Sequence, residues 1–195
     1  MPIYEPREDS YLLSEELKKY LIKLKNRKIN ALDIGTGSGI QAETISEFIN
    51  KKNITCSDIN KEAIEIARKK GFKAVKSDLF SNIKRKFDLI VFNPPYLPKD
   101  RHDKKKDTTG GKKGDETILR FLKQSKKHLN QNGKIFLLLS SLTPRANINK
   151  ELKKHNFKIK KTGRFFASKK QEIFKMKKLS EKKLFFEKLE VWMIN

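Results

Sequence analysis

The chain has 195 residues, of which 36% are hydrophobic and 35% are charged. That length suits one folded domain, and the composition is typical of a globular rather than a disordered protein. The longest purely aliphatic or aromatic stretch, Ile135 to Leu139, is far too short to cross a bilayer, and the first residues hold no apolar signal core. We therefore expect a soluble, cytoplasmic protein with no membrane partner.

The formal net charge of +23 permits two interpretations. A basic surface attracts polyanions by counterion release, which favours a nucleic-acid partner or a place near the ribosome. Alternatively, the charge reflects a general lysine bias, because lysines are spread along nearly the whole chain. The segments 99–113 and 151–195 are the most basic. Charge alone does not choose between these interpretations.

The side chains that usually bind metals are few. Cys56 is the single cysteine, so an internal disulfide and a Cys-based zinc site are both excluded. We expect Cys56 to be a small buried apolar residue of a strand. His102, His128 and His155 lack ligand spacing and are expected at the surface. The sequence therefore predicts no metal site.

From residue 29 onward, short apolar runs alternate with helical patterns. The first helix is expected to begin at an N-cap Ser38 and to bury Ile40, Ile45, Phe48 and Ile49 on one face. The second helix buries Ala63, Ile64 and Ala67 and ends before Gly71. In chain order, we predict a strand over 29–34, a helix over 38–50, a strand over 53–57, a helix over 60–70, and strands over 72–76 and 87–92.

A polar, basic stretch over 98–113 interrupts this rhythm. A helix over 115–129 then follows, with Ile118, Leu119, Leu122 and Leu129 inward, and Asn132-Gly133 turns the chain into a strand over 134–140. A helix is expected over 144–155, and strands over 173–179 and 184–194 form an antiparallel hairpin through the turn 180–183. Residues 156–172 fit strand, helix or loop. The alternation predicts a parallel sheet with helices on both faces.

Three glycines, Gly35, Gly37 and Gly39, follow the first predicted strand. In an open parallel sheet, ligands bind beyond the carboxyl ends of the strands, and glycine lets the backbone approach a ligand closely. The G-x-G-x-G spacing and the preceding Asp33 argue against a pyrophosphate site, because a carboxylate repels phosphate. The same carboxylate suits the cationic amino group of a methionine moiety.

Acidic residues also end the next two predicted strands. Asp58 follows the second strand and is placed to accept hydrogen bonds from ribose hydroxyls, while Asp78 follows the third and is placed to accept from an adenine amino group. The plainer interpretation is that the glycines allow tight packing and the acids cap helices. That interpretation does not explain why the three strand ends that carry these residues converge on one crevice.

The tetrapeptide Asn93-Pro94-Pro95-Tyr96 follows the fourth predicted strand. The two prolines remove backbone donors and fix φ, which leaves the Pro94 carbonyl free to point into a pocket. With the Asn93 side-chain oxygen, that carbonyl forms a pair of acceptors for one planar NH2 group, on which Tyr96 can stack. We predict that these four residues are the catalytic site, which needs no histidine base. The plainer interpretation is a proline-rich turn.

Together these motifs resemble the class I S-adenosylmethionine-dependent methyltransferases that act on nitrogen. The resemblance implies an α/β, Rossmann-like fold with a seven-stranded, mostly parallel sheet that ends in an antiparallel hairpin. It predicts a single domain over 1–195, with a cofactor-covering segment over 1–28, the catalytic core over 29–140 and a helix and hairpin over 141–195. The implied S-adenosyl-L-methionine site comprises Ser10, Asp33, Gly35, Thr36, Gly37, Asp58, Ile59, Asp78, Leu79 and Asn93.

The segment from Tyr4 to Leu13, with Lys183 to Leu189, is similar to the short archaeal and eukaryotic type of HemK-related protein-glutamine methyltransferase. This resemblance implies methylation of the glutamine amide in the Gly-Gly-Gln motif of a class I translation release factor. It also implies a heterodimer with a small zinc-binding activator protein, which adds a strand to the sheet edge. Ser10 corresponds to a position at which members of this group have a hydroxyl group that contacts the cofactor.

Two other functions share parts of this pattern. A tRNA, rRNA or DNA methyltransferase acting on adenine N6 or guanine N2 uses the same tetrapeptide and fits the positive charge. The chain shows no appended RNA-binding domain and no spare aromatic cluster for flipped bases, which argues against it. A non-enzymatic, cofactor-bound assembly factor is the third possibility, and an intact Asn93 motif argues against that one.

Overall fold

The structure is a computed structural model that describes residues 3–24, 28–96, 114–167 and 187–195. Helices and strands alternate in them as the sequence predicts. In chain order the elements are α1 (Glu8–Ile22), β1 (Ala31–Ile34), α2 (Ile40–Ser46), η1 (Lys51–Asn53), β2 (Ile54–Asp58), α3 (Lys61–Lys69), β3 (Lys73–Lys76), β4 (Phe87–Phe92), α4 (Glu116–Ser125), η2 (Lys126–His128), β5 (Leu129–Ser140), α5 (Arg145–Lys154), β6 (Ile159–Ala167) and β7 (Glu187–Ile194).

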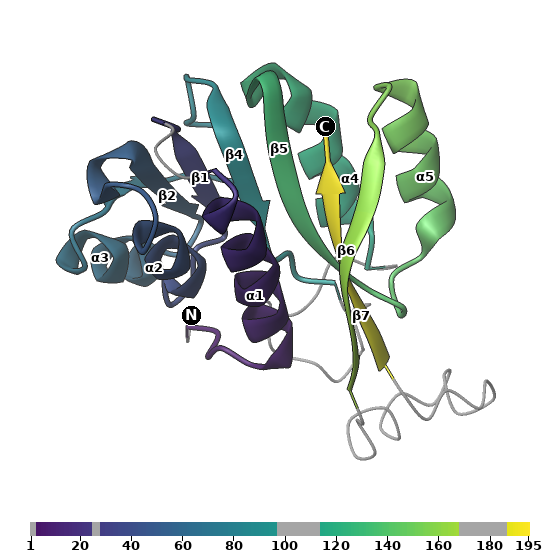
Figure 1. The fold of residues 1–195 in the computed structure, drawn as a ribbon, viewed down its shortest axis with the longest axis horizontal. Helices are drawn as coiled ribbons and strands as arrows, with labels where there is room; N and C mark the ends of the chain where they lie inside the picture. Colours follow the sequence, from purple (N-terminus) through teal and green to yellow (C-terminus); the bar gives the residue numbers. More distant parts are fainter. Residues whose placement is uncertain (1–2, 25–27, 97–113, 168–186) are drawn as a thin grey trace.

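The strands form one seven-stranded sheet in the order β3-β2-β1-β4-β5-β7-β6 (Figure 1). The pairs from β3 through to β5 are parallel, whereas β7 runs antiparallel to both β5 and β6. This arrangement confirms the predicted fold class. Strand order reverses between β1 and β4, so the crevice for a ligand is expected at the carboxyl ends of these two strands.

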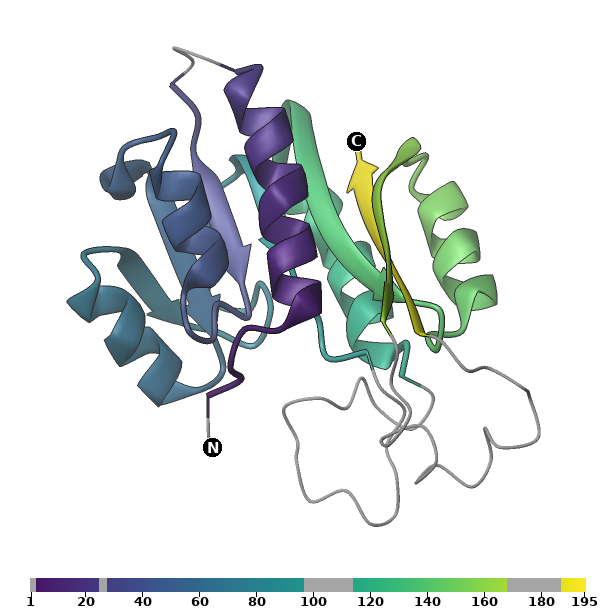
Figure 2. The ribbon, with the colours of Figure 1, turned by 60° about the horizontal axis from the view of Figure 1, so that its bottom comes forward.

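Helices cover both faces of the sheet, as Figures 1 and 2 show. Helices α1, α2 and α3 lie on one face and α4 and α5 on the other. Right-handed crossovers require this division, because the chain moves to one side of β1 through α2 and α3 and to the other side through α4. Both faces of the central strands are therefore buried, which explains the continuous apolar run from Leu89 to Phe92 in β4.

Helix α1 attaches to the sheet through one apolar stripe. Leu13, Leu17 and Leu21 recur at helical spacing and are buried against α2 and the strands β5, β6 and β7. Gly163 in β6 permits the close approach of α1, because a Cβ at that position would lie 2.5 Å from Glu16 Cγ. The packing of this stripe holds the start of α1 near the carboxyl edge of the sheet (Figure 2).

Several predicted boundaries are corrected by the structure. Ser38 is not the N-cap of α2: that position is Gly39, with φ of 87°, and the helix ends at Ser46, which leaves Phe48 exposed. Helix α4 ends at Ser125, so Leu129 begins β5 rather than closing a helix. Asn132, with φ of 66°, does not turn the chain into a new strand. It lies within β5, at the place where the pairing of β5 with β4 shifts register.

The C-terminal hairpin has a different first strand from the predicted one. Strand β7 pairs with β6, over Ile159–Ala167, inside the segment that the sequence left open. The predicted strand over 173–179, its turn over 180–183 and the whole basic stretch 98–113 lie outside the described residues. Within the described residues, no helix is long and apolar enough to span a bilayer.

Candidate active site

The glycine turn and the Asn93 tetrapeptide lie side by side at the carboxyl edge of the sheet. The turn follows β1 and the tetrapeptide follows β4, and the last residues of these neighbouring strands, Ile34 and Phe92, are paired. Strand β2, which ends in Asp58, flanks β1 on its other side. Tertiary structure thus brings together three motifs that are up to 60 residues apart in sequence, as the strand order requires.

The glycine turn uses backbone conformations that favour glycine. Gly35 and Gly37 have φ of 63° and 51°, in the left-handed region. A Cβ on Gly35 would also touch the Phe92 ring at 3.4 Å, whereas a Cβ on Gly37 would meet open space apart from one carbonyl oxygen at 3.9 Å. The Thr36 N–H donates to the Ser57 carbonyl at 3.0 Å, which fixes the turn to β2. Gly37 therefore presents bare backbone to the crevice.

Asp58 joins the turn to the start of α3. One carboxylate oxygen accepts from the Gly37 N–H at 3.0 Å, and the other accepts from the Asn60 N–H at 2.8 Å. The carboxylate is half-buried, and each oxygen retains acceptor capacity beyond these bonds. The next residue, Ile59, is 58% exposed, which places an apolar surface beside this carboxylate.

Asp33 and Asp78 have partners within the protein. Asp33 is only 1% exposed and accepts a 2.6 Å hydrogen bond from Thr36 Oγ1. Burial raises the pKa of Asp33 to about 7, although the Thr36 hydrogen bond opposes this shift. Asp78, half exposed, forms a 2.6 Å ion pair with Arg120 of α4, a partner that nothing in the sequence indicated. The left-handed Leu79, with φ of 51°, follows Asp78.

The Asn93 side chain is held in one orientation. Its Nδ2 donates to Asp9 Oδ2 at 3.1 Å and lies 3.4 Å from Ser10 Oγ, and both acceptors belong to the first turn of α1. Its Oδ1 is buried and accepts no hydrogen bond from any residue that the structure describes. An unpaired buried carbonyl oxygen is costly, so this atom suits an N–H donor that a substrate would supply.

Asp9 is the central acceptor of this cluster, and the sequence did not indicate it. It is 3% exposed and accepts from the hydroxyls of Tyr4, at 3.0 Å, and of Tyr96, at 3.4 Å, in addition to Asn93. Burial, together with the charge of Asp9, raises the pKa of Tyr4, so that its hydroxyl stays a donor. The sequence feature that could have pointed to Asp9 is its position beside Ser10, a predicted cofactor-binding residue. The Ser10 backbone N–H donates to Asp9 at 2.7 Å.

The prolines and Tyr96 complete the tetrapeptide. Pro94 and Tyr96 are buried, and Pro95 is half-buried. The Tyr96 carbonyl accepts from Thr143 Oγ1 at 3.4 Å, which links the tetrapeptide to the segment after β5. Because the Tyr96 hydroxyl points to Asp9, this ring is part of the wall of the site and holds the N-terminal segment in place.

A polar relay between α1 and α2 fixes the position of the first turns of α1. Gln41 Nε2 donates to the Ser10 carbonyl at 2.9 Å, and its Oε1 accepts from Ser14 Oγ at 3.1 Å. Thr44 Oγ1 lies 3.1 Å from Ser14 Oγ and continues the relay. Since α2 follows the glycine turn directly, these bonds set the position of Asp9 and Ser10 relative to that turn.

Metal-binding side chains do not cluster in the described part of the chain. Cys56 is buried in β2, as expected, and burial raises the pKa of its thiol. His128 stacks on Phe80, with ring centroids 4.6 Å apart, and His155 pairs with Glu151 at 2.9 Å. His102 lies outside the described residues.

Comparisons with known proteins identify the family. A family model described as "Methyltransferase small domain" matches residues 9–168, so the chain belongs to this methyltransferase family. The putative protein N5-glutamine methyltransferase of Methanocaldococcus jannaschii is 36% identical over 174 residues, which are 83% of this chain and 84% of that protein. The release factor glutamine methyltransferase of Rhodopirellula baltica is 30% identical over 76% of this chain, which spans only 57% of that relative. These relatives confirm the predicted family.

A solved structure supports the fold. The E. cuniculi complex of Mtq2 and Trm112, which is described as responsible for the methylation of the translation termination factor eRF1, matches 100% of this chain and 99% of that chain with a TM-score of 0.71. The identity is 23%. Among RNA enzymes, the ribosomal RNA small subunit methyltransferase C of Haemophilus influenzae is 34% identical over 60% of this chain, which spans about a third of that relative.

Proposed function

We propose that this protein transfers a methyl group from S-adenosyl-L-methionine to the side-chain amide nitrogen of a glutamine, and that the glutamine belongs to a translation release factor. The observation that carries this proposal is the Asn93 amide. Its donor side is held by Asp9, and its acceptor side is buried without a partner among the described residues. A primary amide is the substrate group whose N–H such an acceptor would bind.

The residues at the glycine turn fit the cofactor. The exposed Ile59 offers apolar surface for a flat base, and the half-buried Asp58 retains acceptor capacity for ribose hydroxyls. The bare backbone at Gly37 permits close approach. Asp33, being buried, supports the turn through Thr36, and Asp78 would have to share its carboxylate with Arg120. When bound, S-adenosyl-L-methionine supplies an electrophilic methyl group on a sulfonium.

Asn93 then acts by orientation and charge stabilisation. An amide nitrogen is a poor nucleophile because its lone pair is delocalised into the carbonyl group. Asn93 Oδ1, together with the Pro94 carbonyl, would accept the two N–H groups, aim the nitrogen and stabilise the positive charge that develops on it. Transfer of the methyl group to this nitrogen would be accompanied by loss of one of its protons to solvent. Asp9 is a positioning residue, because it holds Asn93 and contacts no reacting atom.

The choice of a release factor as acceptor is supported by the names of the relatives and by the N-terminal segment. The segment from Tyr4 onward, whose resemblance to the HemK-related enzymes predicted this substrate, is the one that supplies Asp9 and Ser10 to the Asn93 amide. One relative is named a release factor glutamine methyltransferase. The glutamine would enter beside a site wall built from this N-terminal segment and Tyr96.

We further propose a small partner protein that adds a strand to β3. Strand β3 lies at the edge of the sheet and pairs only with β2 among the described strands. Its outer backbone groups are therefore available for strand addition. Lys73 and Lys76 are exposed on this edge, a composition that disfavours self-pairing and leaves the edge for a dedicated partner. Any zinc-binding function is assigned to the partner.

The test uses the purified chain, with and without a candidate partner, and S-adenosyl-L-methionine tritiated on the methyl group. Release factor with its native Gly-Gly-Gln motif, the same factor with that glutamine replaced by alanine, and bulk tRNA and rRNA serve as acceptors. Label in the native factor and loss of label in its alanine variant are expected. Label only in RNA would replace the proposal with the nucleic-acid alternative, which the ribosomal RNA relative and the net charge favour.

A further inference from the structure

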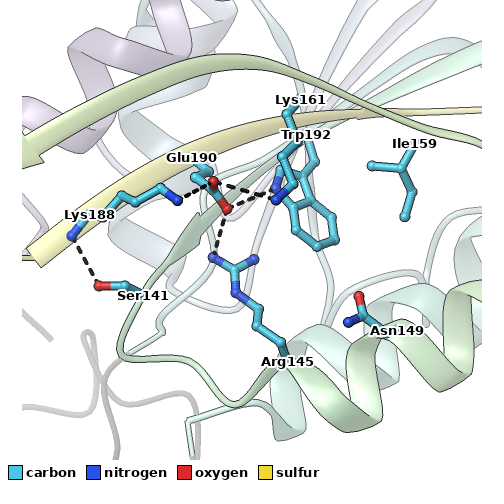
Figure 3. A pocket seen from close by; sticks show the side chains of 8 residues that line it. All are labelled: Ser141, Arg145, Asn149, Ile159, Lys161, Lys188, Glu190 and Trp192. Carbon is cyan, nitrogen blue, oxygen red and sulfur yellow. Dashed lines mark hydrogen bonds and ion pairs between the residues drawn. The ribbon is translucent and has the colours of Figure 1, made fainter.

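A cavity lies away from the glycine turn, between α5 and the face of the β6–β7 hairpin. It has a volume of about 510 Å³, within the range of small-ligand sites. Figure 3 shows Arg145 extending from α5 toward Glu190 and Trp192 of β7, with Asn149 one turn further along the helix. Lys161 of β6 and Lys188 of β7 complete the polar lining. We call this space the hairpin pocket.

The hairpin pocket holds more positive than negative charge. Glu190, with its side chain 5% exposed, is approached by Lys188 at 2.8 Å, Arg145 at 3.4 Å, Lys161 at 3.6 Å and Arg164 at 3.9 Å. Burial by itself raises the pKa of Glu190, but hydrogen bonds from Lys188 and Trp192 and the nearby cations hold it below its usual value. Among the residues that line the pocket, Arg145, Lys161 and Lys188 carry three positive charges against the one carboxylate of Glu190, which leaves a surplus of positive charge.

Arg145 has an unused donor in this pocket. Its Nη2 donates to Glu190 at 3.4 Å and to the Ser140 carbonyl at 3.1 Å. Its Nη1 is buried and has no hydrogen-bond partner within the described ranges. Figure 3 shows this second terminal nitrogen of the guanidinium turned toward the space beside Trp192 and Asn149. A buried guanidinium N–H without an acceptor is costly, so an anion in the pocket would relieve it.

The hairpin pocket adjoins the candidate active site. Ser141 and Arg145 both line the pocket, and between them Thr143 donates to the carbonyl of Tyr96 at 3.4 Å. The segment after β5 therefore contacts the catalytic tetrapeptide on one side and the pocket on the other. A polyanion bound in the pocket would therefore be linked to the tetrapeptide through this segment.

We propose that the hairpin pocket binds a backbone phosphate of RNA and thereby anchors the enzyme on an RNA that accompanies its protein substrate. A phosphate offers several acceptor oxygens to donors that converge from α5, β6 and β7, which a planar carboxylate matches less well. The net charge of +23 favours a polyanionic strand over a free anion, because neutralising successive phosphates releases counterions. This inference goes beyond the proposed function, since glutamine methylation itself requires no RNA.

Trp192 reports on the pocket directly. It is the single tryptophan of the chain, and its ring lies 4.8 Å from the Arg145 guanidinium and 5.2 Å from Lys161 Nζ. Movement of either cation toward a phosphate would change its fluorescence. The full chain is titrated with a uridylate RNA of about 12 nucleotides. Parallel titrations use inorganic phosphate and a glutamate peptide of similar length.

Two lysine variants separate the pocket from general surface charge. Lys161→Gln removes a pocket cation that is itself half exposed, so the fold should be retained. Lys160→Gln is the matched control, because it changes the charge equally on the neighbouring residue, whose side chain projects from the opposite face of β6. We expect Lys161→Gln to weaken RNA binding about 3- to 10-fold and to reduce the slope of log K against log salt by about 0.7, with less than a two-fold change for Lys160→Gln.

Other outcomes overturn the inference. Equal weakening by the two variants, or RNA binding without any change in Trp192 fluorescence, would assign the affinity to diffuse surface charge. Stronger, Lys161-dependent binding of the glutamate peptide would make the pocket a site for an acidic protein segment. Quenching by inorganic phosphate but not by RNA would make it a free-anion site. Because none of these measurements involves methyl transfer, failure here leaves the proposed function untouched.

Discussion

Replacing Asp9 with alanine tests whether the enzyme depends on a fixed orientation of the Asn93 amide. Asp9 accepts from Asn93 Nδ2 at 3.1 Å, and this bond distinguishes the nitrogen from the oxygen of the amide. Without it, the amide can turn over and present a donor where the substrate needs an acceptor. A hydrogen bond to a charged group is worth about 1.5–3 kcal/mol, which corresponds to a loss in the methyl-transfer rate of about 10- to 100-fold.

The assay is single-turnover methyl transfer to the release factor, with cofactor affinity measured separately by calorimetric titration. Affinity for S-adenosyl-L-methionine should change less than about three-fold, because Asp9 contacts Asn93, Tyr4 and Tyr96 rather than the glycine turn. Glu8→Ala is the control, because it removes an exposed carboxylate from the preceding residue of the same helix. Urea denaturation verifies that both variants are folded.

Three results would refute this reasoning. If Asp9→Ala and Glu8→Ala lower the rate equally, the effect comes from the charge of the segment and not from the Asn93 contact. If cofactor binding is lost along with the rate, Asp9 belongs to the cofactor site. If the rate is unchanged while the protein stays folded, the Asn93 orientation is set by other contacts, such as Ser10.

Three further predictions concern other side chains. Asn93→Ala should keep cofactor affinity within several-fold by calorimetry yet lose most turnover, and abolished binding would move Asn93 into the cofactor site. Asp58→Ala should weaken cofactor binding by about 1–3 kcal/mol through lost hydrogen bonds, and unchanged affinity would exclude that acid from the site. The folded-state pKa of Asp33 is raised to about 7, so its protonation stabilises the fold below about pH 4 and that contribution is lost as pH rises toward 7. Asp33→Asn should therefore flatten the pH dependence of urea stability between about pH 4 and 7, by up to about 4 kcal/mol, and an undiminished slope would assign it to other groups.

The sequence predicted the central elements because their patterns are local. The apolar run of β4 and the helix α3, with Asn60 as its N-cap and Gly71 after its end, were placed almost to the residue. Elements whose conformation depends on pairing with distant segments were not predicted. The first strand of the hairpin, β6, has a polar, basic run from Lys160 to Arg164, and its strand conformation depends on the pairing with β7 and the close approach of α1 at Gly163.

The same division applies to the candidate site. Glycine spacing and the Asn93 tetrapeptide are local features, and the order of strands was enough to predict that they meet. Two contacts were not predictable in this way. Arg120 reaches Asp78 from α4, and Asp9 reaches Asn93 from a position 84 residues earlier in the chain. Such pairs are decided by how helices pack on the sheet.

By itself, the amino-acid sequence determined the family, the parallel sheet and the two motifs that lie side by side at the carboxyl edge of this sheet. These depend on hydrophobic periodicity and on residues, such as glycine and proline, whose conformational preferences are intrinsic. Only the tertiary structure decided which atoms of the site are free. The buried, unpartnered oxygen of Asn93 and the unpartnered nitrogen of Arg145, in the part of the chain that the structure describes, follow from where α1 and α5 dock. Docking is set by side-chain packing between distant segments, which no local pattern records.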